Sequence, residues 1–424
     1  MKLVAGILLV ICSSTSAAAQ NRSEDEYTRY ELLAPDTASF KIVYDVTAVT
    51  PGARFYFNPI RKGSEASDES VIDLMTGTSL KFEEVTGQQA RDAGFARADL
   101  ETHYIKVALA RPVPEGGEGR IRILKTYKDA KSYHRDGDAI VFDRPLGIKR
   151  NAVVLPAGYE LISCNIPVQI IEEADGRIAV SFMNPYPGEA PLVVKARPLP
   201  STSRPAASDQ QPAANAPRPP AATAAASVER PMNQIRVSER AFQDREIVYF
   251  LKAPETHAFS LYHDYTESRE GVAQYVNVVR AGSTVSEPSA KILDTGEPLS
   301  YEILKGDELV RRKIDTGGED VSPATVAVVI PFPAVKRGQS VRLRISETYT
   351  DPARYALVDG QLLWHRSFGR PRNDVVLPSG WYVTASSMPA VVTQDADGRT
   401  RLIFWNQRPD NIDVFLKARK RPTS

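Results

Sequence analysis

The chain has 424 residues, and its 53 lysines and arginines nearly balance its 52 aspartates and glutamates. This balance excludes the strong overall field with which many proteins attract nucleic acid or anionic membranes, so we expect no nucleic-acid partner. Beyond the first 19 residues no stretch is apolar for long enough to form a membrane helix, so we expect no transmembrane segment in the mature chain.

Residues 1–19 are typical of a secretory signal peptide. Lys2 provides a basic start, and the apolar core that ends at Cys12 is too short to cross a bilayer. The small residues Ala17–Ala19 predict cleavage before Gln20. We therefore expect a periplasmic or secreted protein.

One cysteine, Cys164, remains after the expected cleavage, so the mature chain has no internal disulfide. A catalytic thiol needs a histidine partner, and the neighbours Ser163 and Asn165 do not provide one. We expect Cys164 to be a small buried residue, like the aligned Ser386 in the second half of the chain.

A ten-residue segment occurs twice in the chain. The sequence RNAVVLPAGY at 150–159 returns as RNDVVLPSGW at 372–381, which is 222 residues later. Upstream, Tyr30 and its surroundings match Tyr249 at a distance of 219 residues. These matches predict a tandem duplication.

The composition changes sharply between the two copies. Residues 199–233 are mainly Pro, Ala, Ser, Thr, Gln and Asn, and they lack the aliphatic side chains that a core requires. We predict that this stretch is a disordered Pro/Ala-rich linker. The predicted domains are then a first repeat over 20–198 and a second repeat over 234–424.

Both repeats show the alternation of apolar and polar residues that is typical of β-strands with one buried face. The apolar positions of four such runs are Ile121 and Ile123; Ile178, Val180 and Phe182; Val341, Leu343 and Ile345; and Ile412, Val414 and Leu416. Many short strands at this spacing favour a β-sandwich. We predict an all-β protein with two tandem homologous β-sandwich-type domains.

Two turn signals and two weak helix signals complete this prediction. Asp175-Gly176 and Asp397-Gly398 each separate two apolar runs, as in tight hairpins. Short helices are predicted over residues 88–100 and 234–244, where alanine and charged residues mix.

The chain contains none of the local motifs of common enzymes and cofactor sites, such as G-x-S-x-G, H-E-x-x-H, a P-loop or G-x-G-x-x-G. His257 and His263 would share one face of a strand, but a third metal ligand is missing because Asp264 would point the other way. We therefore expect no metal, no other cofactor and no catalytic residue recognisable from a motif.

Aromatic side chains in the second repeat are candidates for ligand binding. Trp405 follows the inward-facing Phe404, so strand alternation places it on the outer face. One of the adjacent Trp381 and Tyr382 is also expected to be exposed, whereas the alternative is that these large residues belong to the core. The positions that align with the three tryptophans Trp364, Trp381 and Trp405 hold Phe142, Tyr159 and Met183 in the first repeat.

Arg366 and Arg372 flank a loop around Gly369, and two arginines occupy the aligned positions of the first repeat. A pair of guanidinium groups could bind a carboxylate, a phosphate or sugar hydroxyls. The alternative is a structural role in which they bond to loop carbonyls. The predicted ligand-binding residues are therefore Trp405, Trp381, Tyr382, Arg366 and Arg372.

The tandem β layout resembles that of extracellular adhesion and carbohydrate-binding modules at the level of the fold. We therefore expect an exported, non-catalytic binding or scaffolding protein of the bacterial cell envelope, with polysaccharide, peptidoglycan or an envelope protein as partner. One alternative is an envelope hydrolase whose dispersed carboxylates leave no local motif. Another is an accessory domain of an envelope protease or transporter.

Overall fold

The computed structural model describes residues 26–200, 245–316 and 320–422, and this part of the chain is almost entirely β, as predicted. The expected signal peptide, the linker from residue 201 onward and the helix expected over 234–244 lie outside the described residues.

The strands of the first repeat are short and closely spaced. They are β1 (Glu26–Leu32), β2 (Ser39–Ala48), β3 (Phe55–Pro59), β4 (Glu65–Asp73), β5 (Phe82–Thr86), β6 (His103–Ala108), β7 (Gly119–Lys128), β8 (Tyr133–Asp136), β9 (Ala139–Leu146), β10 (Arg150–Val154), β11 (Tyr159–Glu172), β12 (Ile178–Met183) and β13 (Ala190–Pro198). A 3-10 turn, η1 (Pro35–Thr37), follows β1, and the helix α1 (Gly87–Asp92) follows β5.

The second repeat has the same succession of elements, with one added two-residue strand, β18. Its strands are β14 (Arg245–Leu251), β15 (Ala258–Glu267), β16 (Gln274–Val279), β17 (Thr284–Ile292), β18 (Pro298–Leu299), β19 (Glu302–Lys305), β20 (Val326–Pro331), β21 (Val341–Thr350), β22 (Tyr355–Val358), β23 (Gln361–Phe368), β24 (Arg372–Val376), β25 (Trp381–Gln394), β26 (Thr400–Trp405) and β27 (Ile412–Lys420). The turn η3 (Pro254–Thr256) and the helix α2 (Gly306–Arg311) occupy the places of η1 and α1.

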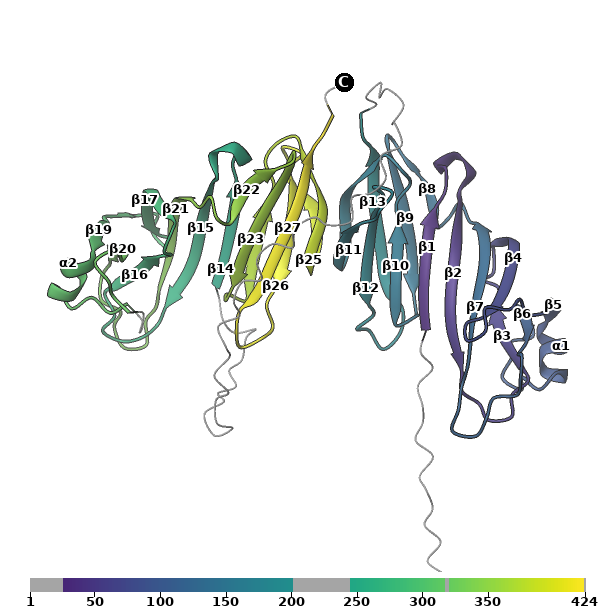
Figure 1. Ribbon diagram of the computed structural model, residues 1–424. Helices are drawn as coiled ribbons and strands as arrows, with labels where there is room; N and C mark the ends of the chain where they lie inside the picture. Colours follow the sequence, from purple (N-terminus) through teal and green to yellow (C-terminus); the bar gives the residue numbers. More distant parts are fainter. Residues whose placement is uncertain (1–25, 201–244, 317–319, 423–424) are drawn as a thin grey trace, which may run out of the picture. The chain divides into compact units, whose positions relative to one another are not determined.

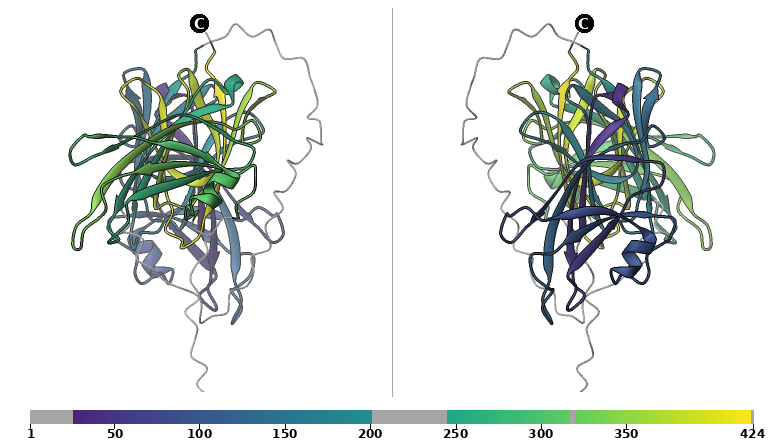
Figure 2. Two further views of the ribbon diagram at one scale, coloured as in Figure 1. Left: turned by 90° about the vertical axis from the view of Figure 1, so that its left-hand side faces the viewer. Right: turned by 90° about the vertical axis from the view of Figure 1, so that its right-hand side faces the viewer.

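By its internal contacts the chain divides into two compact units, and this division does not follow the two repeats. The first unit takes residues 44–62 and 70–123, with the start of β1, and the second takes 28–43, 63–69 and the chain from residue 124 onward. The first unit contains the small sheet of β3, β6 and β5 with α1, which faces the viewer in the right-hand view of Figure 2. Its core cluster is Val85, Ala90, Ala98 and Tyr104.

The helix expected over residues 88–100 is much shorter in the structure. Helix α1 begins after Thr86, whose hydroxyl accepts a hydrogen bond from the Gln89 backbone while the Gln89 side chain bonds back to the Thr86 N–H. The helix ends at Asp92, and Gly94 then takes a left-handed φ of 100° that a continuing helix excludes.

The second unit contains all described residues of the second repeat. A small sheet of β16, β20 and β19 with α2 lies at one end of this repeat and faces the viewer in the left-hand view of Figure 2. The larger sheet is built by antiparallel pairing of β14 with β15, β15 with β21 and β21 with β17, while β24 pairs parallel to β14 and antiparallel to β26. Large side chains that include Trp364, Phe259 and Phe404 fill the core.

Strand β25 passes from one sheet layer of this sandwich to the other. Its first residues pair with β27, and its last residues, from Val391, pair with β26. A register shift between Val383 and Ala385 marks a bulge, the irregularity that lets a strand turn between layers. In the first repeat β11 does the same between β13 and β12, with a shift between Leu161 and Ser163.

The two repeats meet through these equivalent strands, since β11 pairs antiparallel with β25 (Figure 1). Val168 lies opposite Ala390, its own counterpart in the duplication, and Cys164 and Ile170 lie opposite Val392 and Ser386. A strand that pairs with its own equivalent makes an approximately two-fold interface, as in a symmetric homodimer.

The two predicted Asp-Gly hairpins are present. Gly176 lies between β11 and β12 and Gly398 between β25 and β26, with left-handed φ values of 80° and 79°. The backbone N–H of Gly176 donates to Glu173, and that of Gly398 donates to Asp395, both at 2.9 Å.

Candidate functional site

Trp405 is the most exposed large aromatic side chain in the described part of the chain. It lies at the end of β26, where 54% of it is exposed, whereas the preceding Phe404 is fully buried. Strand alternation produces this contrast, and the predicted exposure of Trp405 is confirmed. Because Trp364 and Trp381 are buried, Trp405 is the tryptophan that meets solvent.

Arg372 of β24 lies directly opposite Trp405 in the β24–β26 register, so the structure brings these two predicted residues together. Its guanidinium carbon is 5.6 Å from the indole ring centroid, within cation–π range. Oxygens of Asp374 and Glu246 lie 3.4 Å from the same guanidinium group. Arginine carries five N–H donors, so a flat aromatic face lies beside a group that can donate further hydrogen bonds.

A network of ionic hydrogen bonds holds this surface in place. The buried carboxylate of Asp374 accepts a hydrogen bond from Arg401 at 3.0 Å. Arg401 also donates two hydrogen bonds to Asp395, at 2.7 and 3.0 Å, and the bond to Asp395 raises the pKa of Arg401. Such bidentate pairs fix geometry as well as charge, so Arg372 and Trp405 rest on an ordered base.

The first repeat presents a different side chain at the same place. Met183 lies opposite Arg150 in the β10–β12 register, and 78% of it is exposed. Both repeats thus place an arginine and a large apolar residue on adjacent strands, but only the second offers an aromatic ring at this position.

The prediction that either Trp381 or Tyr382 is exposed is wrong, because only 5% of Trp381 and 7% of Tyr382 remain exposed. Strand alternation predicts one buried and one exposed face, but β25 is covered on both. Burial raises the pKa of Tyr382, and Glu172 and Glu160 of the first repeat act on its hydroxyl. Charged groups of the first repeat thus lie near the Tyr382 side chain, which the alternation of β25 alone does not predict.

The prediction that Arg366 binds a ligand at the surface also needs correction, because its guanidinium group lies inside the fold. It pairs with the buried Asp351 at 3.5 Å, and its guanidinium carbon lies 5.2 to 5.9 Å from the ring centroids of Phe259, Tyr349 and Tyr249. In the first repeat the buried Arg144 pairs with Asp129 at 3.0 Å and faces Tyr30, Phe40 and Tyr127. Two copies of one buried cation in an aromatic cage indicate a structural role.

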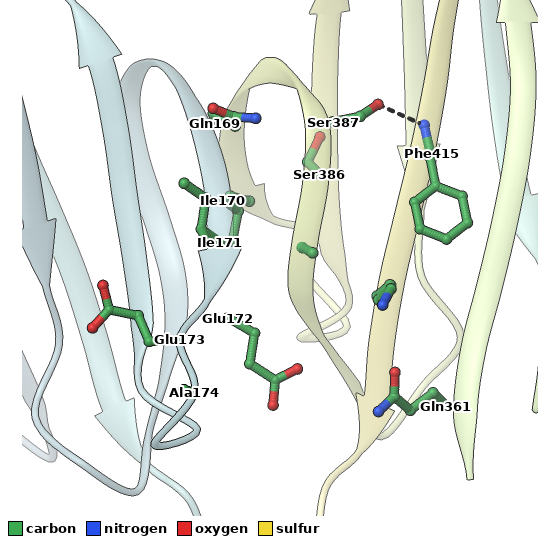
Figure 3. A pocket seen from close by; sticks show the side chains of 12 residues that line it. Gln169, Ile170, Ile171, Glu172, Glu173, Ala174, Gln361, Ser386, Ser387 and Phe415 are labelled. Atoms are coloured by element: carbon green, nitrogen blue, oxygen red, sulfur yellow. Dashed lines mark hydrogen bonds between the residues drawn. The ribbon is translucent and has the colours of Figure 1, made fainter. Parts of the chain in front are cut away.

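A groove of about 430 Å³ opens where the two repeats meet. Figure 3 shows its lining from β11 on one side and from β25 and β27 on the other; the residues include Gln169, Ile171, Glu172, Ser387 and Phe415. Within this lining, Glu172 forms an ion pair of 2.5 Å with Arg419. The lining mixes apolar and polar side chains, which suits a junction between two domains.

The two histidines that are close in sequence have separate surroundings. His257 precedes β15 with a left-handed φ of 53°, and its Nδ1 lies 2.9 Å from the Tyr355 carbonyl oxygen. His263 lies within β15 and contacts the Tyr275 hydroxyl. Over residues 26–200, 245–316 and 320–422, no three His, Cys, Asp or Glu side chains are placed to hold a metal ion.

Cys164 is buried, and this burial raises the pKa of its thiol to about 12. A thiol with such a pKa is almost entirely protonated at neutral pH and is a poor nucleophile. This agrees with the prediction of a small buried residue.

No protein-family model and no curated protein matches this chain. Among solved structures, an M1 zinc metallopeptidase from Deinococcus radiodurans has 13% sequence identity and a TM-score of 0.28, covering 42% of this chain and 43% of its own. An aminopeptidase N family protein from Idiomarina loihiensis has 11% identity and a TM-score of 0.25, covering 41% of this chain and 29% of its own. The chain spans less than half the length of each of these structures.

The helices in the described part of the chain are too short and too polar to cross a membrane.

Proposed function

We propose that the protein is an exported, non-catalytic binding protein of the bacterial cell envelope whose second repeat binds carbohydrate through Trp405 and Arg372. The exposed indole beside an arginine is the observation that carries this proposal. A large aromatic side chain left in water on an ordered strand loses the stabilisation that burial would give it, and contact with a ligand restores it.

The chemistry of the pair suits a sugar ring. An indole is flat and apolar on its face, so it packs against the C–H groups of a pyranose. The guanidinium group of Arg372 donates hydrogen bonds to hydroxyl oxygens at the edge of the same ring. Polysaccharide or the glycan strands of peptidoglycan are therefore the proposed partners, and the signal-like residues 1–19 support an envelope location.

Isothermal titration calorimetry with soluble peptidoglycan fragments and common polysaccharides tests this proposal. We expect saturable binding of at least one glycan by the full chain and at least a tenfold loss in Trp405→Ala, as is usual for a central aromatic contact. Met183→Ala, at the aligned position of the first repeat, is the matched control and should bind like the wild type. Equal binding by Trp405→Ala and the wild type would contradict the proposal.

A further inference from the structure

A cluster of polar side chains lies on the inner face of β15, at the end away from the aromatic core. His263, Tyr265 and Glu267 are buried there, on the face where Phe259 and Leu261 belong to the core. Buried polar groups are stable only where each has a partner. Glu267 has its partners, since it accepts hydrogen bonds from Arg269 and from the Tyr265 hydroxyl.

Two half-buried arginines face this cluster without a carboxylate partner among the described residues. Arg245 of β14 lies opposite Tyr265 in the β14–β15 register, with its guanidinium carbon 4.2 Å from the ring centroid. Arg370 lies just before β24, close enough for its charge to act on His263 and on Arg245. Burial and then the charge of Arg370 lower the pKa of Arg245, since both disfavour its positive charge.

The remaining polar contacts place an unused hydrogen-bond donor in the same cluster. The His263 Nδ1 lies 3.1 Å from the Tyr275 hydroxyl, and the positive charge of Arg370 is close enough to act on this hydroxyl. A hydroxyl near a cation turns its oxygen toward that charge, so the Tyr275 hydroxyl donates its proton to Nδ1. The proton of the neutral imidazole is then on Nε2.

That Nε2 atom is buried and has no hydrogen-bond partner in the described structure, and His263 as a whole is only 4% exposed. Burial, followed by the charges of Arg370 and Arg245, lowers the pKa of His263 well below its usual value, so the ring is neutral at pH 7. A buried N–H without an acceptor is costly unless a ligand supplies one.

The first repeat has none of this cationic cluster. The positions aligned with Arg245, His263 and Arg370 hold Glu26, Tyr44 and Ile148. The Tyr44 hydroxyl donates to the Glu26 carboxylate at 2.6 Å, so these two groups satisfy each other without a ligand. The second repeat therefore carries two positive charges where the first carries one negative charge.

We propose that Arg245, Arg370 and the Nε2–H of His263 form a binding site for a single oxyanion, a phosphate or carboxylate group of a small ligand. The two guanidinium groups supply the charge, and the histidine supplies a directed donor from inside the fold. The same two charges repel a metal cation. This site uses other side chains than the Trp405 surface, and it does not depend on the function proposed above.

The test is calorimetric titration of the full chain with inorganic phosphate and with acetate, at constant ionic strength set with sodium chloride. We expect one saturable site per chain for at least one anion and at least tenfold weaker binding in Arg370→Gln and in Arg245→Gln. Tighter phosphate binding identifies a phosphate ligand, and tighter acetate binding identifies a carboxylate. Circular dichroism verifies that each variant is folded.

Tyr275→Phe provides a variant that changes no charge. It removes the hydroxyl that orients His263, so it should weaken anion binding and move the imidazole nitrogen resonances in the nuclear magnetic resonance spectrum. Arg408→Gln, which changes an exposed arginine of the same repeat, is the control that should bind anion like the wild type. The proposal is overturned if the wild type binds neither anion, or if the Arg370 and Arg245 variants bind as tightly as the wild type.

Discussion

Gly176 and Gly398 stand at the tips of the two hairpins, with φ values that residues with a side chain rarely adopt. An added Cβ would meet no heavy atom within 4 Å at either place, so the cost of a substitution comes from the backbone alone. We expect Gly398→Val and Gly176→Val to lose about 1 kcal/mol or more of unfolding free energy.

Thermal and urea unfolding measure this loss. Gly188→Val is the matched control, because Gly188 also has open space around its Cβ position but no left-handed φ. Unchanged melting of both hairpin variants would show that the turn geometry is wrong.

Lys125 makes the stability of the protein depend on pH. It is buried near Tyr127, and burial, with a smaller effect of Arg144, lowers its pKa from 10.5 to about 7. Between these values the unfolded chain binds a proton that the folded chain does not, so stability increases as the pH rises from 7 to 10. We expect the unfolding free energy of Lys125→Met, measured with urea at pH 7 and at pH 10, to lack this part of the increase.

Lys128→Met changes an exposed lysine on the same strand and should keep the pH dependence of the wild type. The same dependence in Lys125→Met and in the wild type would contradict the account of Lys125.

At the residue scale, the sequence predicts the exposure of a side chain correctly where this exposure depends on a single strand. The exposure of Trp405 follows from its buried neighbour Phe404 and strand alternation. Contacts between segments that are distant in the sequence decide instead whether Trp381, Tyr382 and Arg366 are exposed. Polar residues on the core face of β15, such as His263, interrupt the apolar positions of the strand, and this interruption is the sequence signal for the buried polar cluster.

At the scale of elements, period-two alternation predicted the strands β7, β12, β21 and β27. Alternation reports one buried face for each strand, so it could not predict the strand-to-strand docking of the two repeats. The helix expected over residues 88–100 came from composition alone and shortened to α1, since Gly94 and tertiary packing outweigh a weak propensity.

The interface between the repeats rests on an ionic cluster that mutation can test. The carboxylate of Glu160, which is buried, accepts hydrogen bonds from Arg197 at 2.6 Å and from Arg421 of the second repeat at 2.8 Å. We expect Arg421→Ala to lose about 1.5–3 kcal/mol of unfolding free energy, the usual range for hydrogen bonds to charged groups.

A double-mutant cycle with Glu160→Gln should show that the two changes are not additive. Arg408→Ala, which breaks an exposed ion pair with Asp410, should cost less than about 1 kcal/mol. Additive effects of the Glu160 and Arg421 changes would contradict the docking of the repeats through this cluster.

At the scale of the whole molecule, the two repeats share a succession of elements and a buried arginine cage but differ on their surfaces. Trp405 and the cluster of Arg245, Arg370 and His263 are present in the second repeat alone. This difference supports the proposal that the second repeat binds a ligand, because the groups proposed to bind belong to that repeat.

The most direct test of the proposed binding role is a tryptophan fluorescence titration of the full chain. Trp364 and Trp381 are buried, so a change in emission on adding a glycan reports on Trp405. The account predicts a saturable shift of the emission to shorter wavelength with a peptidoglycan fragment or a polysaccharide, and loss of that shift in Trp405→Phe. An emission spectrum that stays the same with every glycan tested would contradict it.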